Sequence, residues 1–241
     1  MEEITAKIGG LKIDTEFKKL DLSIDEINDR IKKEICYETL NDLSDAKLMC
    51  EYKNCNSVKN EIKKLGDILD KYVNEELKQK IIQEYFLELI PAGTKGVIRG
   101  NKFNLIVKQT ILKLFKDQHD KLEPQAFEIC FEKKCEGYPT DEIPDWYILE
   151  KTKNKVIIGM NQLDLWGGGQ QLNRGSKYIV NTKYNENCKL LCVVCNEIQI
   201  KSKTKIYKIF KIGFENNTLC YLKNLHHIIR LFYNIKQDLS Q

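Results

Sequence analysis

The chain lacks the long apolar runs and the leading sequence that would direct it into or across a membrane. No stretch of about 18 uncharged apolar residues occurs, which excludes an ordinary transmembrane helix. The opening residues, MEEITAKIGG, contain neither a basic n-region nor an apolar stretch, so they do not form a secretory signal. We therefore expect an intracellular, cytoplasmic protein. Its 241 residues, 42% of them apolar, are enough for a sizeable core.

The chain also lacks a large excess of charge of either sign. Its 39 Lys and Arg against 35 Asp and Glu give a formal net charge of +4, too little to indicate a polyanionic partner. The distribution of charge is more informative. Acidic and basic residues nearly balance in residues 1–88, whereas basic residues dominate 95–116 and 177–211. These two basic stretches flank a polar segment at residues 143–179.

The nine cysteines are an odd number, and a chain without an export signal meets reducing conditions, so free thiols are expected rather than a disulfide framework. The closest cysteines and the two adjacent histidines would in principle supply tetrahedral zinc ligands. These residues are Cys188, Cys192, Cys195, Cys220, His226 and His227. Residues 189–200, however, resemble a buried strand in which Cys192 and Cys195 point to opposite faces, which disfavours a zinc site.

The first ninety residues have the spacing of apolar side chains that is typical of helices. Two amphipathic helices are predicted, over residues 22–40 and 58–89, with Gly66 as the weak point of the second. Their charged faces favour solvated surface over a binding device, although a partner-binding or dimerising arm is an alternative. We expect an N-terminal helical region, residues 1–90, packed on a core of residues 91–241.

A glycine-rich basic segment, AGTKGVIRGNKFN, follows Pro91. It predicts a short irregular connection before a helix over residues 103–115, because three glycines let backbone amides approach an anion closely. It is not a Walker A loop, since it lacks the terminal Gly-Lys-Ser/Thr and a preceding parallel strand. Either it contacts nucleic acid or it is a mobile basic loop. The side chains that would make such contacts are Lys95, Arg99, Asn101 and Asn104.

From residue 125 onward the pattern changes from helical to extended. The β-prone or apolar runs cover residues 126–131, 146–149, 156–160, 178–181, 189–200 and 206–214. Residues 219–239 return to helical spacing. The chain as a whole therefore predicts an α/β (α+β) fold with a central mixed β-sheet flanked by helices.

The polar residues in the middle of the chain indicate phosphodiester chemistry. Asp145 follows a proline and opens an extended run, and the apolar strand 156–160 comes about a dozen residues later. Hydrolysis of a phosphodiester requires a hard cation, and Mg²⁺ takes oxygen ligands from carboxylates, carbonyls and amides. Alternation along the second strand puts Asn161 on one face and Gln162 with Asp164 on the other. Two adjacent strands would bring these oxygens together.

The segment 143–179 resembles the active-site core of type II restriction endonucleases in the PD-(D/E)XK nuclease superfamily. Pro144 and Asp145 match the leading PD, and residues 156–160 match the apolar strand before the acid-x-lysine element. At that element the chain has the sequence NQLD, without a lysine, and members of the superfamily vary there. GVIRGNKFN upstream and LWGGGQQLNRGSKYI downstream are similar to stretches of certain restriction enzymes, so the resemblance covers about residues 84–181.

The resemblance implies an Mg²⁺-dependent endonuclease that cleaves double-stranded DNA at a short specific sequence. The residues it assigns to catalysis are Asp145, Asn161, Gln162, Asp164 and Lys177, with Glu84 or Glu88 as an upstream carboxylate. Asp145 would hold Mg²⁺ together with an oxygen from Asn161 or Gln162, and Asp164 would be a second ligand or an outer-shell acceptor. Lys177 would take the place of the missing lysine.

If the protein is a nuclease, a cluster of amides and one arginine is predicted to recognise the DNA sequence. Its members are Gln170, Gln171, Asn173 and Arg174. Amides pair bidentately with adenine and arginine with guanine in the major groove. The alternative is that Gly167 to Gly169 simply turn the chain and the amides cap or decorate a nearby helix. A homodimer is expected, because palindromic sites favour two-fold protein symmetry.

Two other classes of protein remain open. One is a structure-specific or repair nuclease of the same superfamily. The other is a catalytically inactive DNA-binding protein, and the missing acid-x-lysine element favours this second alternative.

Overall fold

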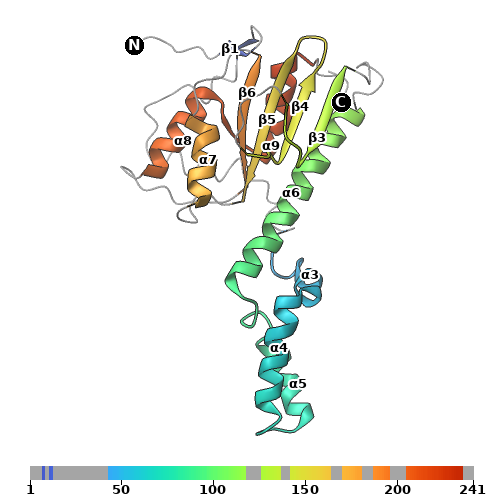
Figure 1. The fold of residues 1–241 in the computed structure, drawn as a ribbon. Coiled ribbons are helices and arrows are strands. Elements are labelled where there is room, and N and C mark those ends of the chain that lie inside the picture. The colour runs from blue at the N-terminus through green and yellow to red at the C-terminus, as the bar shows by residue number, and fades with distance from the viewer. Residues whose placement is uncertain are drawn as a thin grey trace. The chain divides into compact units, whose positions relative to one another are not determined.

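A computed structural model shows two compact units (Figure 1). It describes residues 7–8, 11–12, 43–117, 126–136, 142–163, 170–180, 187–195 and 205–235. The helical unit comprises residues 37–103, and the sheet unit comprises residues 1–36 together with 104–241. The boundary between the units therefore lies inside a helix, α6 (Ala92–Asp117).

The sheet unit is built on a mixed five-stranded sheet with the order β3-β4-β5-β6-β7 (Figure 1). Its strands are β3 (Phe127–Phe131), β4 (Trp146–Glu150), β5 (Lys155–Gln162), β6 (Cys188–Val194) and β7 (Leu219–Tyr221). The first three strands pair antiparallel, and β5, β6 and β7 pair parallel. The predicted mixed sheet with flanking helices is confirmed. A separate two-stranded ladder pairs β1 (Lys7–Ile8) with β2 (Leu11–Lys12).

One face of the sheet packs against α6 and α9 (Leu222–Tyr233). The ring of Phe127 on β3 lies 5.2 Å, centroid to centroid, from Phe115 of α6 and 5.2 Å from Tyr233 of α9. Side chains alternate between the two faces along each strand, and residues paired between neighbouring strands point to the same face. The other residues on the face of Phe127 can therefore be identified from the pairing. We call it the α6 face, and it includes Phe127, Phe131, Trp146, Ile148, Ile157, Gly159, Asn161 and Lys189.

The opposite face packs against α7 (Gln170–Val180) and α8 (Lys205–Asn216). A Cβ added to Gly213 of α8 would lie 2.6 Å from the Cβ of Leu219 and 2.9 Å from Cγ2 of Ile179, so α8 closely contacts both β7 and α7. The hydroxyl of Thr218 donates to the Ile179 carbonyl at 2.6 Å. We call this the α7 face, and its strand residues include Tyr147, Ile158, Met160, Gln162, Leu190, Cys192 and Leu219.

The helical unit contains α3 (Met49–Asn54), α4 (Asn56–Leu69), α5 (Glu75–Glu84) and the beginning of α6. Its core is formed by Leu48, Tyr52, Val58, Phe86 and Ile90. The prediction of one helix over residues 58–89 is wrong, because the chain turns between Leu69 and Glu75 rather than weakening at Gly66. There the side chain of Asn74 accepts the backbone N–H of Leu77 at 2.9 Å and begins a new helix. The predicted helix over residues 22–40 lies outside the described residues.

The predicted irregular connection after Pro91 is also wrong, because α6 runs without a break from Ala92 to Asp117. The N–H of Lys95 donates to the Pro91 carbonyl at 3.1 Å, so the helix is established in its first turn and does not leave a glycine loop for an anion. Val107, Ile111 and Leu114 are buried at helical spacing. Their packing outweighs a cost of about 1 kcal/mol for each glycine. None of the described helices, α6 included, is long and apolar enough to cross a membrane.

Two predicted strands are helices in the structure. Residues 178–181 were expected to be extended but begin in the last turn of α7, and residues 206–214 lie within α8. Short apolar runs fit a buried strand and a buried helix equally well, so periodicity does not separate them. Conversely, β7 lies where helical spacing was expected to have resumed. Strand β6 ends at Val194, and residues 196–200 of the predicted strand lie outside the described residues.

Candidate functional site

Asp145 lies immediately before β4, beside the carboxyl end of β5. Trp146 at the start of β4 pairs with Gly159 near the end of β5, so these two strand ends meet at one edge of the sheet. The Oδ2 atom of the half-buried Asp145 accepts the backbone N–H of Asn161 at 2.5 Å. The predicted side-by-side arrangement of the two strands is therefore confirmed, and Asp145 is held against the end of β5.

The side chain of Asn161 is fixed on the α6 face by two hydrogen bonds. Its Oδ1 accepts the indole N–H of Trp146 at 2.9 Å, and its Nδ2 donates to Oδ1 of Asn104 on α6 at 3.1 Å. Because an indole nitrogen only donates, the Asn161 oxygen must face Trp146 and its amide nitrogen must face Asn104. Asn104, predicted as a DNA contact or a helix cap, thus joins the predicted site as a partner of Asn161.

Gly159 makes room for this arrangement. A Cβ at this position would lie 1.9 Å from Cε2 and 2.1 Å from Cζ2 of Trp146, so the indole lies directly over the glycine backbone. Trp146 is fully buried there, and its indole N–H reaches the Asn161 oxygen. An isolated glycine in a strand often marks such a close approach, but the sequence alone does not show which side chain makes it.

The carboxylate of Asp145 and the amide of Asn161 lie on different faces of the sheet. Asp145 directly precedes Trp146, which lies on the α6 face, so alternation along the extended chain directs the Asp145 side chain toward the α7 face. In agreement, burial raises the pKa of the Cys192 thiol on that face and the Asp145 carboxylate raises it further. Gln162 is buried on the same face, paired with Val194. Of the two amides proposed as partners of Asp145, Gln162 is therefore the one that shares its face.

Lys177 lies on α7, which packs against β5 and β6 on the Asp145 side of the sheet. Its Nζ lies 2.9 Å from Oε1 of Glu142, three residues before Asp145. The Lys177 side chain is 63% exposed, so its ammonium keeps access to solvent while bound to Glu142. The structure thus brings Lys177 to the chain segment that leads into Asp145.

The remaining predicted site residues fall into three groups. The cluster Gln170, Gln171, Asn173 and Arg174 belongs to the first half of α7, so a helix does begin at the amides, and the described part of the structure does not extend to these side chains. Asp164 lies outside the described residues. Exposed residues of the helical unit make up the third group, which comprises Arg99 and Asn101 on α6, Glu84 at the end of α5 and Glu88.

Lys95 belongs to the helical unit as well, and it is engaged within that unit. Its Nζ lies 3.7 Å from Oδ2 of Asp45. Both side chains are partly exposed, at 30% and 40%, so this ion pair is weak and screened by solvent. Lys95 is therefore available to an anion at little energetic cost.

The cysteines and histidines do not form a metal site in the part of the chain that the structure describes. No group of three His, Cys, Asp or Glu side chains there could hold a metal ion, and the described cysteines are free thiols. Cys192 lies on the α7 face, whereas Cys220 pairs with Val193 and lies on the α6 face. The Nε2 of His226 is 2.8 Å from the Thr110 carbonyl, so it joins α9 to α6.

A further group that sequence reasoning did not single out is Lys189 on β6. It pairs with Ile157 in the interior of the sheet and lies on the α6 face. Burial lowers the pKa of Lys189 from 10.5 to about 8, an effect that the nearby Cys220 partly offsets. The basic character of residues 177–211 in the sequence includes this lysine but gives no sign of its burial.

Comparison of the chain with protein-family models, with curated proteins and with solved structures finds no match, so the chemistry of the site is argued from its own residues.

Proposed function

We propose that the protein is an Mg²⁺-dependent endonuclease that cleaves double-stranded DNA at a short specific sequence, as a type II restriction enzyme of the PD-(D/E)XK superfamily with a variant motif. One observation carries the proposal. Asp145 follows Pro144 at the start of β4, and its carboxylate is bonded to Asn161 at the end of the apolar strand β5. This is the pairing of a leading PD with a second strand that the resemblance of the sequence implies.

Asp145 and Gln162 are the residues that would hold the metal. Mg²⁺ keeps several waters and is usually held by one or two carboxylates and the phosphates of the substrate. One carboxylate and one amide oxygen on the α7 face fit such a site, which the DNA phosphate would complete. When bound, the cation would polarise the phosphorus centre and lower the pKa of an attacking water.

Asn161 has a positioning role in this proposal. Its backbone N–H bonds to the Asp145 carboxylate, and its side chain is bonded to Trp146 and Asn104. A rigid end of β5 therefore limits the orientations of the Asp145 carboxylate. Lys177, whose ammonium is exposed beside Glu142, would orient water and offset the negative charge that develops on the phosphate, an effect worth a few kcal/mol.

DNA recognition is assigned to α7. The amide and arginine side chains of its first half would read base edges in the major groove, with Gln170, Gln171, Asn173 and Arg174 as the reading residues. Lys95, Arg99 and Asn101 of α6 would contact phosphates. A homodimer would match the two-fold symmetry of a palindromic site.

A plasmid digest with the full chain tests this proposal. With Mg²⁺ the wild-type protein should give discrete DNA fragments, and Asp145→Ala should reduce cleavage by at least about 100-fold because the proposed metal-binding carboxylate is lost. The control is Glu51→Ala, an exposed carboxylate of α3 in the helical unit, which should cut like wild type. Circular dichroism should show that both variants are folded. Undiminished cutting by Asp145→Ala would refute the assignment.

The same digest separates the alternative functions. A smear or loss of DNA from its ends indicates a structure-specific or repair nuclease instead. Retardation of DNA without cutting, in the presence of Mg²⁺, indicates a DNA-binding protein without turnover. One observation favours this last alternative: the Asn161 amide at the acid-x-lysine position is committed to hydrogen bonds with Trp146 and Asn104.

A further inference from the structure

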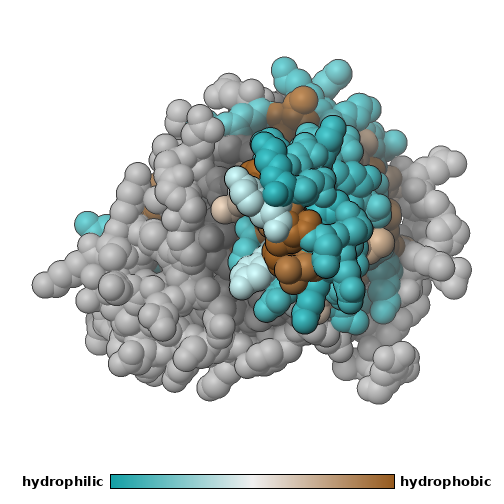
Figure 2. All heavy atoms as spheres, turned by 90° about the horizontal axis from the view of Figure 1, so that it is seen from below, coloured by the Kyte–Doolittle hydropathy of each residue, from teal (hydrophilic) through white to brown (hydrophobic). Residues whose placement is uncertain are grey.

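Beyond Val58 at the start of α4, the hairpin formed by α4 and α5 carries many apolar residues but buries none of them. From residue 59 to residue 85 every side chain is exposed or half-buried. The half-buried apolar residues are Ile62, Leu65, Leu69, Val73, Ile81 and Ile82. The exposed apolar residues are Ile68, Tyr72, Leu77 and Tyr85, and their exposed fractions run from 45% to 78%. Figure 2, which views this end of the helical unit, shows apolar side chains among hydrophilic ones.

The buried core of the helical unit extends along only a small part of this hairpin. The buried core of the helical unit reaches only Val58 at the start of α4 and Phe86 after α5. Helices of 14 and 10 residues are marginal in water by themselves, and most helical stability in proteins comes from the packing of an apolar face. An apolar face that remains open at the end of a hairpin is typical of an interaction site.

The charges of the hairpin indicate what kind of partner fits. Residues 56–85 contain equal numbers of basic and acidic side chains. They are Lys59, Lys63, Lys64, Lys71, Lys78 and Lys80, against Glu61, Asp67, Asp70, Glu75, Glu76 and Glu84. Nucleic acid requires an excess of positive charge, which this surface does not have. Within the hairpin Lys64 already pairs with Glu61, and Lys78 pairs with Asp70 and Glu75. The other charged side chains of the hairpin still carry both signs, so they can pair with those of an identical surface.

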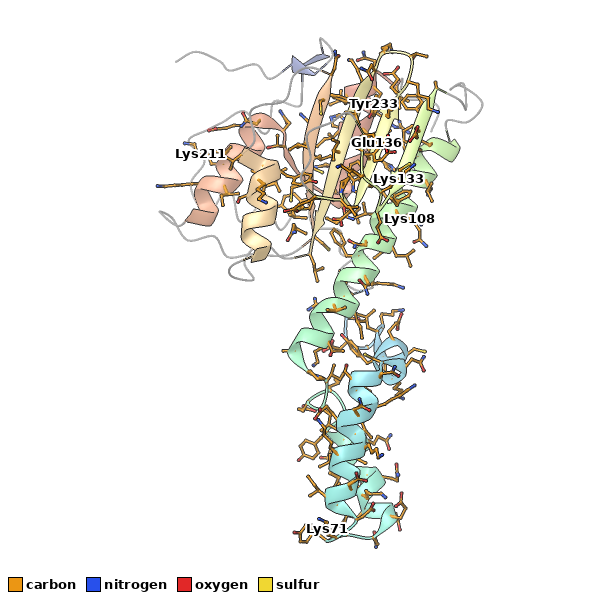
Figure 3. The ribbon with its side chains drawn as sticks, in the orientation of Figure 1. Lys71, Lys108, Lys133, Glu136, Lys211 and Tyr233 are labelled. Atoms are coloured by element: carbon orange, nitrogen blue, oxygen red, sulfur yellow. The ribbon has the colours of Figure 1, made fainter. Side chains whose placement is uncertain are left out.

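We propose that the α4–α5 hairpin is the dimer interface of this protein, and that it packs against the hairpin of a second copy as a four-helix bundle. Ile68, Tyr72 and Leu77 would become buried on association. Lys71, at the turn between the helices, lies at the end of the hairpin in Figure 3 and would remain at the rim of the interface. This inference is independent of the proposed nuclease activity. Cleavage of a palindromic site favours a two-fold symmetric dimer but does not say which surface forms the dimer interface.

Sedimentation or light scattering of the full chain without DNA or Mg²⁺ tests the interface. The wild-type protein should have twice the 28.2 kDa mass of one chain. The double variant Ile68→Lys/Leu77→Lys should raise the dimer dissociation constant by at least about 100-fold, because it removes two apolar side chains and places like charges face to face. The control is Val97→Lys on α6, outside the hairpin and 63% exposed, which should remain dimeric.

Two further measurements keep the test decisive. Tyr72→Lys, at a side chain that is 78% exposed, cannot disturb the fold of one chain and should also weaken the dimer. Mixing Ile68→Lys/Leu77→Lys with Ile68→Glu/Leu77→Glu should restore the dimer mass through opposite charges. A monomeric wild-type protein, or hairpin variants that dimerise as well as wild type, would overturn the proposal. Because no DNA is present, this failure is distinguishable from a failure of the cleavage assay.

Discussion

Gly159 lies under the Trp146 indole, where there is no room for any side chain. We expect Gly159→Ala to destabilise the protein by about 1–3 kcal/mol or more, because a methyl group would overlap the ring and force Trp146 out of its packing. Urea unfolding measures the loss, and a red shift of tryptophan emission should accompany it. Loss of the Trp146 contact to Asn161 should also reduce DNA cleavage.

The matched control for this variant is Gly66→Ala on α4. A Cβ at Gly66 meets no atom within 4 Å, and alanine is favoured over glycine in a helix by about 1 kcal/mol. Gly66→Ala should therefore stabilise the protein slightly. If the two substitutions had equal effects, the steric role of Gly159 would be disproved.

Lys189 makes stability depend on pH through its lowered pKa of about 8. Between pH 8 and 10.5 the lysine keeps its proton in the unfolded chain but loses it in the folded protein. The unfolded state then binds more protons, so the contribution of Lys189 to stability rises with pH across this window. Below pH 8 Lys189 is protonated in both states, so the full free-energy cost of holding its charge in the folded protein is present.

Lys189→Met removes the charge of this half-buried side chain and keeps its length. We expect the variant to be more stable than wild type by roughly 1–2 kcal/mol at pH 7, with the gain vanishing as the pH approaches 10.5. Urea unfolding of both proteins at pH 7 and pH 10 provides the measurement. A gain of the same size at both values would mean that packing, and not the charge, is responsible.

At the scale of elements, Tyr233 joins α9 to the two strands that carry the site (Figure 3). Its hydroxyl accepts the Ile157 N–H of β5 at 3.0 Å and donates to the Ile148 carbonyl of β4. Tyr233→Phe should cost about 1–3 kcal/mol, because two buried backbone groups lose their partner. Thermal unfolding measures this cost. A harmless Tyr233→Phe would show that these backbone groups find other partners.

The elements that were predictable from the sequence are those with a strong local pattern. The runs that became β3, β4 and β5 are rich in β-branched and aromatic residues, which suit a pleated sheet, and β6 is an apolar run that ends in two valines. Residues 206–214 have a similar composition but form α8, because packing of Ile209 and Gly213 against neighbouring elements decides between two compatible conformations. Similarly, the low helix propensity of the glycines in α6 is outweighed by the burial of Val107 and Ile111 in that helix.

At the scale of the site, the sequence indicated the importance of Asp145 and its proximity to the end of β5. It left open whether Asn161 or Gln162 would accompany the carboxylate. The register of β4 against β5 and the bond from Trp146 assign Asn161 to the α6 face, so Gln162 is the one of these two amides on the α7 face. Sequence spacing could not reveal this, because the position of Trp146 over Gly159 depends on pairing between strands.

At the scale of the whole molecule, the amino-acid sequence by itself determined the fold class, a mixed sheet with flanking helices, because alternation and helical spacing of apolar residues are local properties of the chain. Only the tertiary structure decided which strands are parallel, which helices cover each face, and that Asn104, Trp146 and Asn161 meet. These features depend on contacts between residues far apart in the sequence, and such contacts stabilise the protein only once the chain is folded.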